Sequence, residues 1–335
     1  MKTQNIYTEI DACRLCLSKN LHPILDLDNQ PPANSLRKDL SEPVPEAPLA
    51  LLWCDDCSII QLTATVDPAS LFSQYVWVTA TSATARSYSE IYCDEVLKRT
   101  AVESPFVVEI ASNDGTFLKQ FKSKGCPVLG VDPAQNIAVD ATNAGIPTWA
   151  EFFDLTIAKK ILAEKQQPNI VMARNVIPHV KEIHSIVEGL SALIDDTGMV
   201  VIEFHYSKAI AEELHYDSIY HEHLFYFSIK SLCALCAQYG LFPFDVLESP
   251  ISGGSLVAYF SKTPRKATAA LTEKFAWEEN RGLASLATWR EFATRSQEHR
   301  LQLKALVETE IKDGKKLKAV QIGGPSGVIG RTQAQ

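Results

Sequence analysis

The chain has 335 residues, 46% of them hydrophobic and 21% charged, a composition that fits a folded protein of two or three domains. Its net charge is −8 and no cluster of Lys and Arg stands out, which argues against a nucleic-acid-binding protein. The longest apolar runs, such as MVVIEF at residues 199–204, fall short of the roughly twenty residues that cross a bilayer. Because the first residues also lack the apolar core of a signal peptide, we expect a cytoplasmic protein without a membrane partner.

Two Cys-x-x-Cys pairs lie in the first part of the chain, Cys13 with Cys16 and Cys54 with Cys57. Each short turn can direct two sulfurs at one point, so the two pairs together predict a tetrahedral zinc site. Four cysteine ligands leave no open coordination position, and the metal would therefore be structural. The proline-rich segment between the pairs is longer than in a zinc ribbon, and two unrelated turns with reduced, buried cysteines are the alternative.

From about Pro105 onward, short apolar runs alternate with helical stretches. This alternation is typical of βαβ units and predicts a doubly wound α/β domain with a parallel sheet. The four runs are residues 106–112, 126–132, 169–175 and 198–205. A further strand is predicted at residues 254–262, a long helix at 265–312 and a last strand at 316–324.

The carboxyl ends of the parallel strands are the expected ligand site. The first strand leads into a turn of small residues before a helix, where a ligand can approach backbone amides, yet neither a P-loop nor G-x-G-x-x-G is present. Asp132 follows the second strand about twenty residues later, where a carboxylate can accept both hydroxyls of a ribose. This pattern predicts an adenosyl site without a phosphate cradle, as S-adenosylmethionine (SAM) requires. The alternative is a plain α/β domain in which Asp132 only caps a helix.

The predicted cofactor-binding residues surround these strand ends. They are Glu109, Ala111, Ser112, Asn113, Asp114, Gly115, Asp132, Pro133 and Asn175.

Several motifs occur in a fixed order along the chain: CRLC, PPANSL, a second Cys-x-x-Cys, LFSQYVW, EIASNDGTFL, GVDPAQNIA, ARNVIPHV, YDSIYHEHLFYFS and SGGSL. In this order they resemble the sugar C-methyltransferases that act on nucleotide-linked keto-deoxysugars, over nearly the whole chain. The resemblance implies a zinc-binding domain at residues 1–75, a class I Rossmann-like SAM methyltransferase domain at 76–248 and a C-terminal Rossmann-like domain at 249–335. The last domain is shorter than the family usually has. Such enzymes deprotonate the carbon next to a ketone and methylate the enolate.

The segment HYDSIYHEHLFYFS, residues 215–228, is the expected catalytic element. Removing a proton from carbon beside a ketone needs a base, a donor for the enolate oxygen and a methyl group held in line. The resemblance makes His223 the base, Tyr220 a group that stabilises or orients near the reacting carbon, and Glu222 a group that orients substrate or base. An aromatic, hydrogen-bonded core segment is the alternative interpretation.

Two residues from other parts of the chain complete the predicted site. The resemblance implies that His179 adds a polar contact to the sugar and that Tyr75, or its neighbour Trp77, closes the pocket from the N-terminal side. Ala111 departs from the family, because this position is often glycine there; the added methyl group is small, and SAM binding should persist.

Three function classes follow from these patterns. The first is a SAM-dependent C-methyltransferase that acts, as a monomer, on a small nucleotide-linked keto sugar. The second is a SAM-dependent methyltransferase for another carbon, oxygen or nitrogen acceptor. The third is a non-catalytic protein that keeps the SAM fold.

Overall fold

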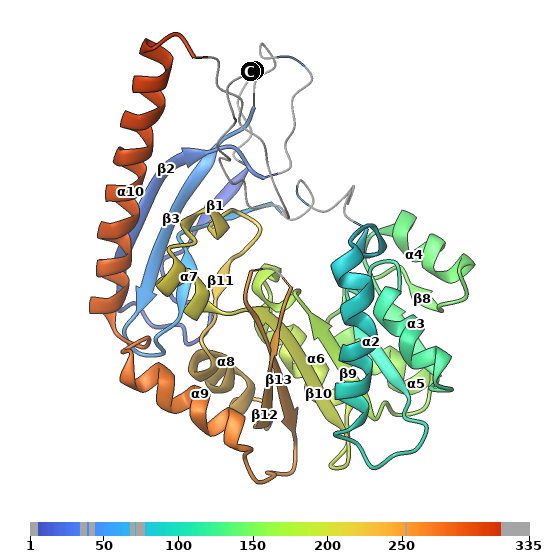
Figure 1. Cartoon of the computed structure of the whole chain (residues 1–335). Coiled ribbons are helices and arrows are strands. Elements are labelled where there is room, and N and C mark those ends of the chain that lie inside the picture. The colour runs from blue at the N-terminus through green and yellow to red at the C-terminus, as the bar shows by residue number, and fades with distance from the viewer. Residues whose placement is uncertain are drawn as a thin grey trace. The chain divides into compact units, whose positions relative to one another are not determined.

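The computed structural model describes residues 6–33, 39, 44–67, 71, 78–251 and 253–315, and the chain divides into two compact units (Figure 1). Unit 1 consists of Met1–Asp67, Ser207–Ser228 and Glu278–Gln335, and unit 2 of Pro68–Tyr206 and Ile229–Trp277. The chain thus comes back to unit 1 twice after its first 67 residues. Within the described ranges, no helix is long and apolar enough to cross a membrane.

A seven-stranded sheet forms the centre of unit 2. Its order is β12 (Phe242–Ser249), β13 (Ser255–Ser261), β10 (Met199–His205), β9 (Ile170–Arg174), β6 (Val107–Ile110), β7 (Val128–Val131) and β8 (Thr148–Trp149). The five strands from β10 to β8 pair in parallel, and β13 runs antiparallel to both of its neighbours. The predicted parallel sheet is confirmed for the four apolar runs, whose residues are almost all buried, as in sheets covered on both faces.

The strand predicted at residues 254–262 is β13, and it belongs to this same sheet. Only residues 250–254 connect it to β12. So short a connection permits antiparallel pairing alone, because a parallel crossover needs a dozen residues or more. The sheet of unit 2 therefore extends past residue 248, while the predicted three-part division of the chain stays a prediction.

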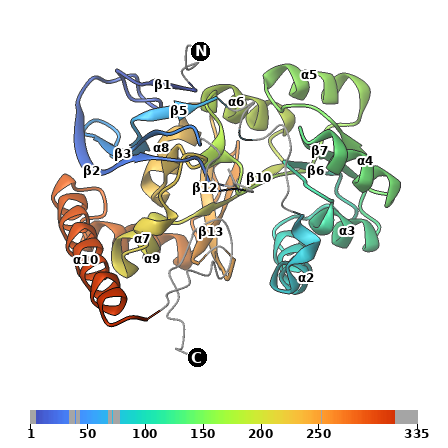
Figure 2. The same ribbon diagram turned by 90° about the horizontal axis from the view of Figure 1, so that it is seen from above.

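Helices pack on both sides of the sheet of unit 2. They are α2 (Ala83–Leu97), α3 (Thr116–Ser123), α4 (Gln135–Asn143), α5 (Leu155–Glu164), α6 (Ile183–Leu193) and α8 (Ile229–Ala237). α2 packs against α3 and α5 against α6, and the view from above shows α3 and α4 beside β6 and β7 (Figure 2). Aromatic side chains from α2, α3 and β13 form much of the core, among them Tyr92, Phe117, Phe121 and Tyr259.

Unit 1 contains a four-stranded antiparallel sheet whose strands come from distant parts of the chain. Its order is β11 (Phe225–Tyr226), β4 (Ile60–Leu62), β3 (Ala47–Cys54) and β2 (Leu21–Gln30). A separate ribbon pairs β1 (Tyr7–Glu9) with β5 (Ala64–Val66). Two helices, α7 (Ser207–Glu213) and α10 (Leu286–Lys312), complete the unit, and α10 contacts β2 (Figure 1).

The single long helix predicted at residues 265–312 is wrong, because the structure has two helices there, α9 (Ala269–Asn280) and α10. Gly282 takes a left-handed φ of +61° and ends the first helix. Ser285 starts the second by accepting a hydrogen bond from the backbone N–H of Ala287. The last predicted strand, residues 316–324, lies outside the described residues.

Candidate functional site

The four predicted metal ligands of unit 1 come together in one cluster. All four sulfur atoms lie within 4.8 Å of one another, with Cys13 Sγ 3.6 Å from Cys57 Sγ and Cys16 Sγ 3.5 Å from Cys54 Sγ. Both turns have the same local form: the residue after the second cysteine, Leu17 or Ser58, has a positive φ and donates its N–H to the carbonyl of the first cysteine. The two turns therefore present their sulfurs in the same way.

The geometry of this cluster fits a zinc ion. Sulfurs that lie about 2.3 Å from a central zinc are about 3.8 Å from each other in a tetrahedron, close to the observed separations. Cys13 Sγ also accepts hydrogen bonds from the backbone N–H of Leu15 at 3.4 Å and from Gln61 Nε2 at 3.1 Å. Hydrogen bonding to the Cys57 thiol lowers the pKa of Cys13 to about 5, so a thiolate is favoured at this ligand.

In unit 2, the turn after β6 has the strained backbone expected of a ligand-binding turn. Ala111 has a φ of +55° and Asn113 a φ of +50°, both in the left-handed region that favours glycine. The turn also approaches β7 closely, because a Cβ added to Gly130 would lie 2.3 Å from Ser112 Oγ. Gly130 is therefore required by the side chain of Ser112.

Asp132, at the end of β7, holds this turn with its carboxylate. Its Oδ2 accepts the backbone N–H of Asn113 at 2.8 Å, and its Oδ1 accepts that of Ala134 at 2.9 Å. Burial raises the pKa of Asp132, and the two amide hydrogen bonds oppose that rise. Each oxygen uses one acceptor position in this way and keeps a second one, and the predicted role of Asp132 in binding a ribose stays a prediction.

The other predicted residues of the turn have structural partners. Asn113 Oδ1 accepts the N–H of Thr79 at 2.9 Å, and Asp114 Oδ2 accepts that of Ala80 at 2.9 Å, both from the short helix η1 (Thr79–Thr81). Gly115 has a φ of +73° at the start of α3. Pro133 is half-buried in the turn before α4. The roles of Asn113, Asp114, Gly115 and Pro133 as cofactor ligands stay predictions.

A buried ionic network lies beneath the same strand ends. Arg174 donates from Nε to Glu203 Oε2 at 2.8 Å, and its Nη1 lies 3.6 Å from Glu109 Oε1. Its guanidinium carbon also lies 3.1 Å from the ring centroid of Phe117. Ser249 donates its hydroxyl to Glu203 Oε1 at 2.5 Å, whereas Glu109 Oε2 has no hydrogen-bond partner among the described residues.

Two carboxyl groups thus share one guanidinium out of contact with water. Because Glu203 has the shorter ion pair and the hydroxyl donor, Glu109 is the carboxyl that keeps a proton. Burial raises the pKa of Glu109 to about 8, against the pull of Arg174. The next residue beyond β9, Asn175, has a φ of +49° and donates its N–H to the carbonyl of Glu203, which ties the end of β9 to β10.

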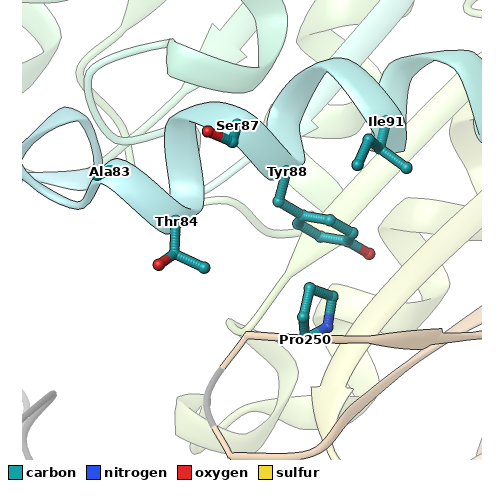
Figure 3. A pocket seen from close by; sticks show the side chains of 6 residues that line it. All are labelled: Ala83, Thr84, Ser87, Tyr88, Ile91 and Pro250. Atoms are coloured by element: carbon teal, nitrogen blue, oxygen red, sulfur yellow. The ribbon is translucent and has the colours of Figure 1, made fainter.

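A cavity of about 430 Å³ opens beside α2 in unit 2 (Figure 3). Figure 3 shows the ring of Tyr88 facing Pro250, the residue that follows β12. The lining residues are Ala83, Thr84, Ser87, Tyr88, Ile91 and Pro250. Since Pro250 follows the carboxyl end of a strand parallel to β10, this cavity lies at the edge of the sheet where ligands of such folds bind.

The predicted catalytic segment forms a tight turn in unit 1. The N–H of His223 bonds to the carbonyl of Tyr220 at 3.0 Å, which brings the two side chains together. The hydroxyl of Tyr220 lies 2.9 Å from Nε2 of His223, and the ring centroids are 4.4 Å apart. Tyr220 is buried and His223 half-buried, so an imidazole and a phenol hydroxyl lie side by side in this turn.

The neighbours of this pair are buried. His221 is 1% exposed, and its Nε2 bonds to the carbonyl of Ala47 at 3.1 Å. Burial lowers the pKa of His221, which favours the neutral imidazole as the donor in this bond. Glu222 is 4% exposed. His179 lies in unit 2, half-buried at the end of the short helix η2 (Ile177–His179), and Tyr75 lies outside the described residues. The roles assigned to these residues stay predictions.

Sequence patterns alone did not identify Gln61, Arg14, Arg174 and Glu203, which support the two sites. Three of them carried a signal: Gln61, Arg174 and Glu203 are polar residues inside apolar strands. A polar side chain at such a position is buried and must find a partner, which marks it as structurally or functionally constrained.

Comparison with known proteins identifies the family. Residues 13–72 match a "Putative zinc binding domain", residues 85–243 a "Methyltransferase domain" and residues 250–326 a "C-methyltransferase C-terminal domain". The chain is 31% identical over 317 residues to C-methyltransferase NovU of Streptomyces niveus, an alignment that covers 93% of this chain and 76% of that protein. The chain belongs to the sugar C-methyltransferase family. It is a SAM-dependent C-methyltransferase with a class I methyltransferase fold and a zinc-binding module formed by four cysteines.

Solved structures give only distant similarity. The PH0226 protein of Pyrococcus horikoshii is 13% identical, with a TM-score of 0.44 over 58% of this chain and 98% of that one. Magnesium protoporphyrin IX methyltransferase of Synechocystis, with bound SAM, is 10% identical, with a TM-score of 0.41 over 53% of this chain and 79% of that one.

The cysteine cluster predicts about one zinc ion per chain in purified protein. Cys54→Ser replaces one ligand of the closed shell, so the variant should lose most of its zinc, and its melting temperature should fall by at least about 5 °C. Elemental analysis and calorimetry measure both. The control is Cys233→Ser, which changes a half-buried cysteine on α8 and should keep the metal. Freshly purified protein without zinc would contradict the prediction.

The position of Asp132 predicts its effect on the cofactor. Asp132→Ala should weaken binding of SAM and S-adenosylhomocysteine at least tenfold, about 1.4 kcal/mol, because hydrogen bonds to a carboxylate are lost and the turn loosens. Isothermal titration calorimetry measures the affinity, with Asp140→Ala on the exposed face of α4 as the control. Unchanged affinity in a folded Asp132→Ala protein would place the adenosyl site elsewhere.

The raised pKa of Glu109 predicts a pH-dependent stability. Between the unfolded value of 4.5 and about 8, the folded protein keeps a proton on Glu109 that the unfolded chain has released. Stability is therefore lost as the pH rises through this window, by up to about 1.4 kcal/mol per pH unit. Glu109→Gln cannot lose a proton, so its stability relative to the wild type should increase from pH 6 to pH 8.

Urea denaturation of the full chain at several pH values measures this difference. Glu90→Gln, an exposed change on α2, serves as the control and should show no such trend. A difference between Glu109→Gln and wild type that is independent of pH would show that Glu109 is ionised throughout.

Proposed function

We propose that this C-methyltransferase acts on a nucleotide-linked keto-deoxysugar, with His223 as the base that removes the proton from the carbon next to the ketone. The observation that carries the proposal is the 2.9 Å contact between Tyr220 and His223 Nε2 in a turn that the family motif identifies. A C-methyltransferase needs a base of moderate pKa, and an oxygen or nitrogen acceptor could react without one. The keto sugar is the substrate class that the order of motifs indicates.

The contact between Tyr220 and His223 constrains the order of events. When Nε2 accepts the phenol hydrogen, its lone pair is not available to the substrate. We propose that substrate binding separates the two groups, so that the phenol donates to the ketone oxygen and Nε2 faces the acidic C–H bond. The C–H bond then breaks, the proton goes to Nε2, and the electron pair forms the enolate, whose negative oxygen the Tyr220 hydroxyl stabilises.

The remaining residues bind and orient the reactants. SAM, when bound, would supply the methyl group: the enolate carbon forms the new C–C bond as the S–CH₃ bond breaks, and S-adenosylhomocysteine is the leaving group. Asp132 would hold the ribose hydroxyls of the cofactor, and the turn at residues 111–115 offers backbone amides to it. Glu222 would orient the base or the sugar, and His179 would make a polar contact to the sugar. The imidazolium of His223 returns its proton to solvent after product release.

This proposal predicts separate effects on chemistry and on cofactor binding. His223→Asn should lower turnover by roughly 10²- to 10⁴-fold, the usual contribution of a positioned base, and should leave SAM affinity nearly unchanged. The same variant should lose deuterium exchange at the substrate carbon in the absence of SAM. Tyr220→Phe keeps the ring and should show a comparable loss of turnover if its hydroxyl stabilises the enolate.

Mass spectrometry of 4-keto nucleotide sugars incubated with SAM detects a product heavier by one methyl group. The matched control is His215→Ala, a half-buried histidine on the same segment that pairs with Glu213. If exchange and methylation both persist at wild-type rates in folded His223→Asn, another group is the base. If no keto sugar gains a methyl group with the wild-type protein, the substrate class is wrong.

A further inference from the structure

The strands of the zinc-binding module hold the turn that carries Tyr220 and His223. β11 directly follows this turn and pairs with β4, with Phe225 opposite Gln61 and Tyr226 opposite Ile60. The N–H of Leu62 also donates to the carbonyl of Leu224 at 3.0 Å. The position of β4 therefore fixes the position of the residues next to His223.

Gln61 connects β4 to the cysteine cluster. It is 0% exposed and lies in the middle of the sheet, paired with Leu52 on one side and Phe225 on the other. Its Nε2 donates to Cys13 Sγ at 3.1 Å, and its Oε1 accepts the backbone N–H of Arg14 at 3.0 Å. One side chain thus contacts a metal ligand while its own backbone lies against β11.

Arg14, which lies between the two cysteines of the first pair, makes a second connection. Its guanidinium donates to the carbonyl of Leu62 at 2.5 Å and to Thr65 Oγ1 at 2.7 Å. Its central carbon lies 5.9 Å from the ring centroid of Phe225. A zinc ion bound by four thiolates would carry a net charge of −2. The half-buried guanidinium of Arg14 would offset part of that charge next to β11.

Tyr226 of β11 contacts both Tyr220 and His223. Its hydroxyl accepts the backbone N–H of Tyr220 at 3.3 Å, and its ring centroid lies 6.2 Å from that of His223. Tyr226 is 2% exposed and cannot move without displacing its neighbours. A shift of β11 therefore moves both members of the pair.

We propose that Gln61 is a positioning residue for methyl transfer, coupling the geometry of the four-cysteine zinc centre to the Tyr220–His223 pair through β4 and β11. The inference rests on the proposed function for the role of His223 in turnover. The zinc centre then has a second role besides stabilising the fold, because it determines the position of His223. Positioning at this level is worth a large factor in rate, since a displacement of about 1 Å can cost a hundredfold.

The test replaces the amide of Gln61 without changing the length of its side chain. Gln61→Met removes all three hydrogen bonds of the side chain, the one to Cys13 and the two from the backbone and guanidinium of Arg14, and keeps an unbranched side chain in the buried site. Its matched control is Asn20→Ala, which removes an exposed hydrogen bond between Asn20 and Asp56 near the second cysteine pair and does not touch β4. Zinc content, kcat, the KM for SAM and the NMR signal of His223 are measured, the last with histidine labelled at Cε1 and assigned through His223→Asn.

In Gln61→Met with about one zinc bound, the His223 signal should shift or broaden, kcat should fall about tenfold or more, and the KM for SAM should stay within about twofold. Asn20→Ala should match the wild type in all of these. An unchanged His223 signal, or a shifted signal with wild-type kcat, would overturn the inference. The NMR signal reports the coupling even if His223 is not the base, so this failure is distinct from a failure of the proposed function.

If Gln61→Met does not fold or loses its zinc, the wild-type protein with cadmium in place of zinc gives the answer. Cadmium binds the same thiolates with longer bonds and leaves the sequence intact. The His223 signal should differ between the zinc and cadmium forms, while that of His184, bonded to Tyr239 in unit 2, should not. Identical His223 signals in the two forms would overturn the inference.

Discussion

The pairing of β11 with β4 is the constraint on which the position of the Tyr220–His223 turn depends. Two residues of β11 complete a sheet that otherwise consists of strands from the first part of the chain. Pairing β11 with β4 closes a loop that contains all of the chain between residues 62 and 225, which costs conformational entropy. The apolar area buried by Phe225, Tyr226 and Phe227 offsets that cost. This pairing, together with the hydrogen bond of His221 to the carbonyl of Ala47, fixes the position of the Tyr220–His223 turn in unit 1.

Each unit also buries a charge that one arginine balances. In unit 1, Arg14 follows Cys13 and interacts with it electrostatically; in unit 2, Arg174 forms ion pairs with both Glu109 and Glu203. The arrangements differ in one respect. A zinc ion held by the four cysteines would offset the charge of the thiolates, whereas in unit 2 two carboxyl groups share one guanidinium and Glu109, whose pKa is raised, keeps a proton. The second network is therefore sensitive to pH, and it ties β6, β9, β10 and Ser249 at the end of β12 together.

Local sequence patterns were sufficient for much of this protein. Apolar runs of strand length located β6, β7, β9 and β10, and the spacing of four cysteines located the metal centre, because both features are short-range. Composition over residues 265–312 suggested one helix and missed the left-handed Gly282 between two. The pairing of β11 with β4 could not be predicted, since a two-residue strand has no periodicity. The partners of Gln61 and Arg174 could not be predicted either, because they lie far away in the sequence and are brought close only by folding.

The turns after β6 and β9 contain strained residues whose backbone is held by hydrogen bonds. Ala111, Asn113 and Asn175 all adopt positive φ angles, at a cost of order 1 kcal/mol each. The bonds from Asn113 N–H to Asp132 and from Asn175 N–H to Glu203 offset that cost before any ligand arrives. Since Asp132 already has its carboxylate fixed by two backbone amides, ribose hydroxyls would meet an acceptor that needs no reorganisation. Ala111 at a position where the family often has glycine is therefore tolerable: the methyl group adds strain, and the hydrogen bonds around the turn hold its backbone in the strained form.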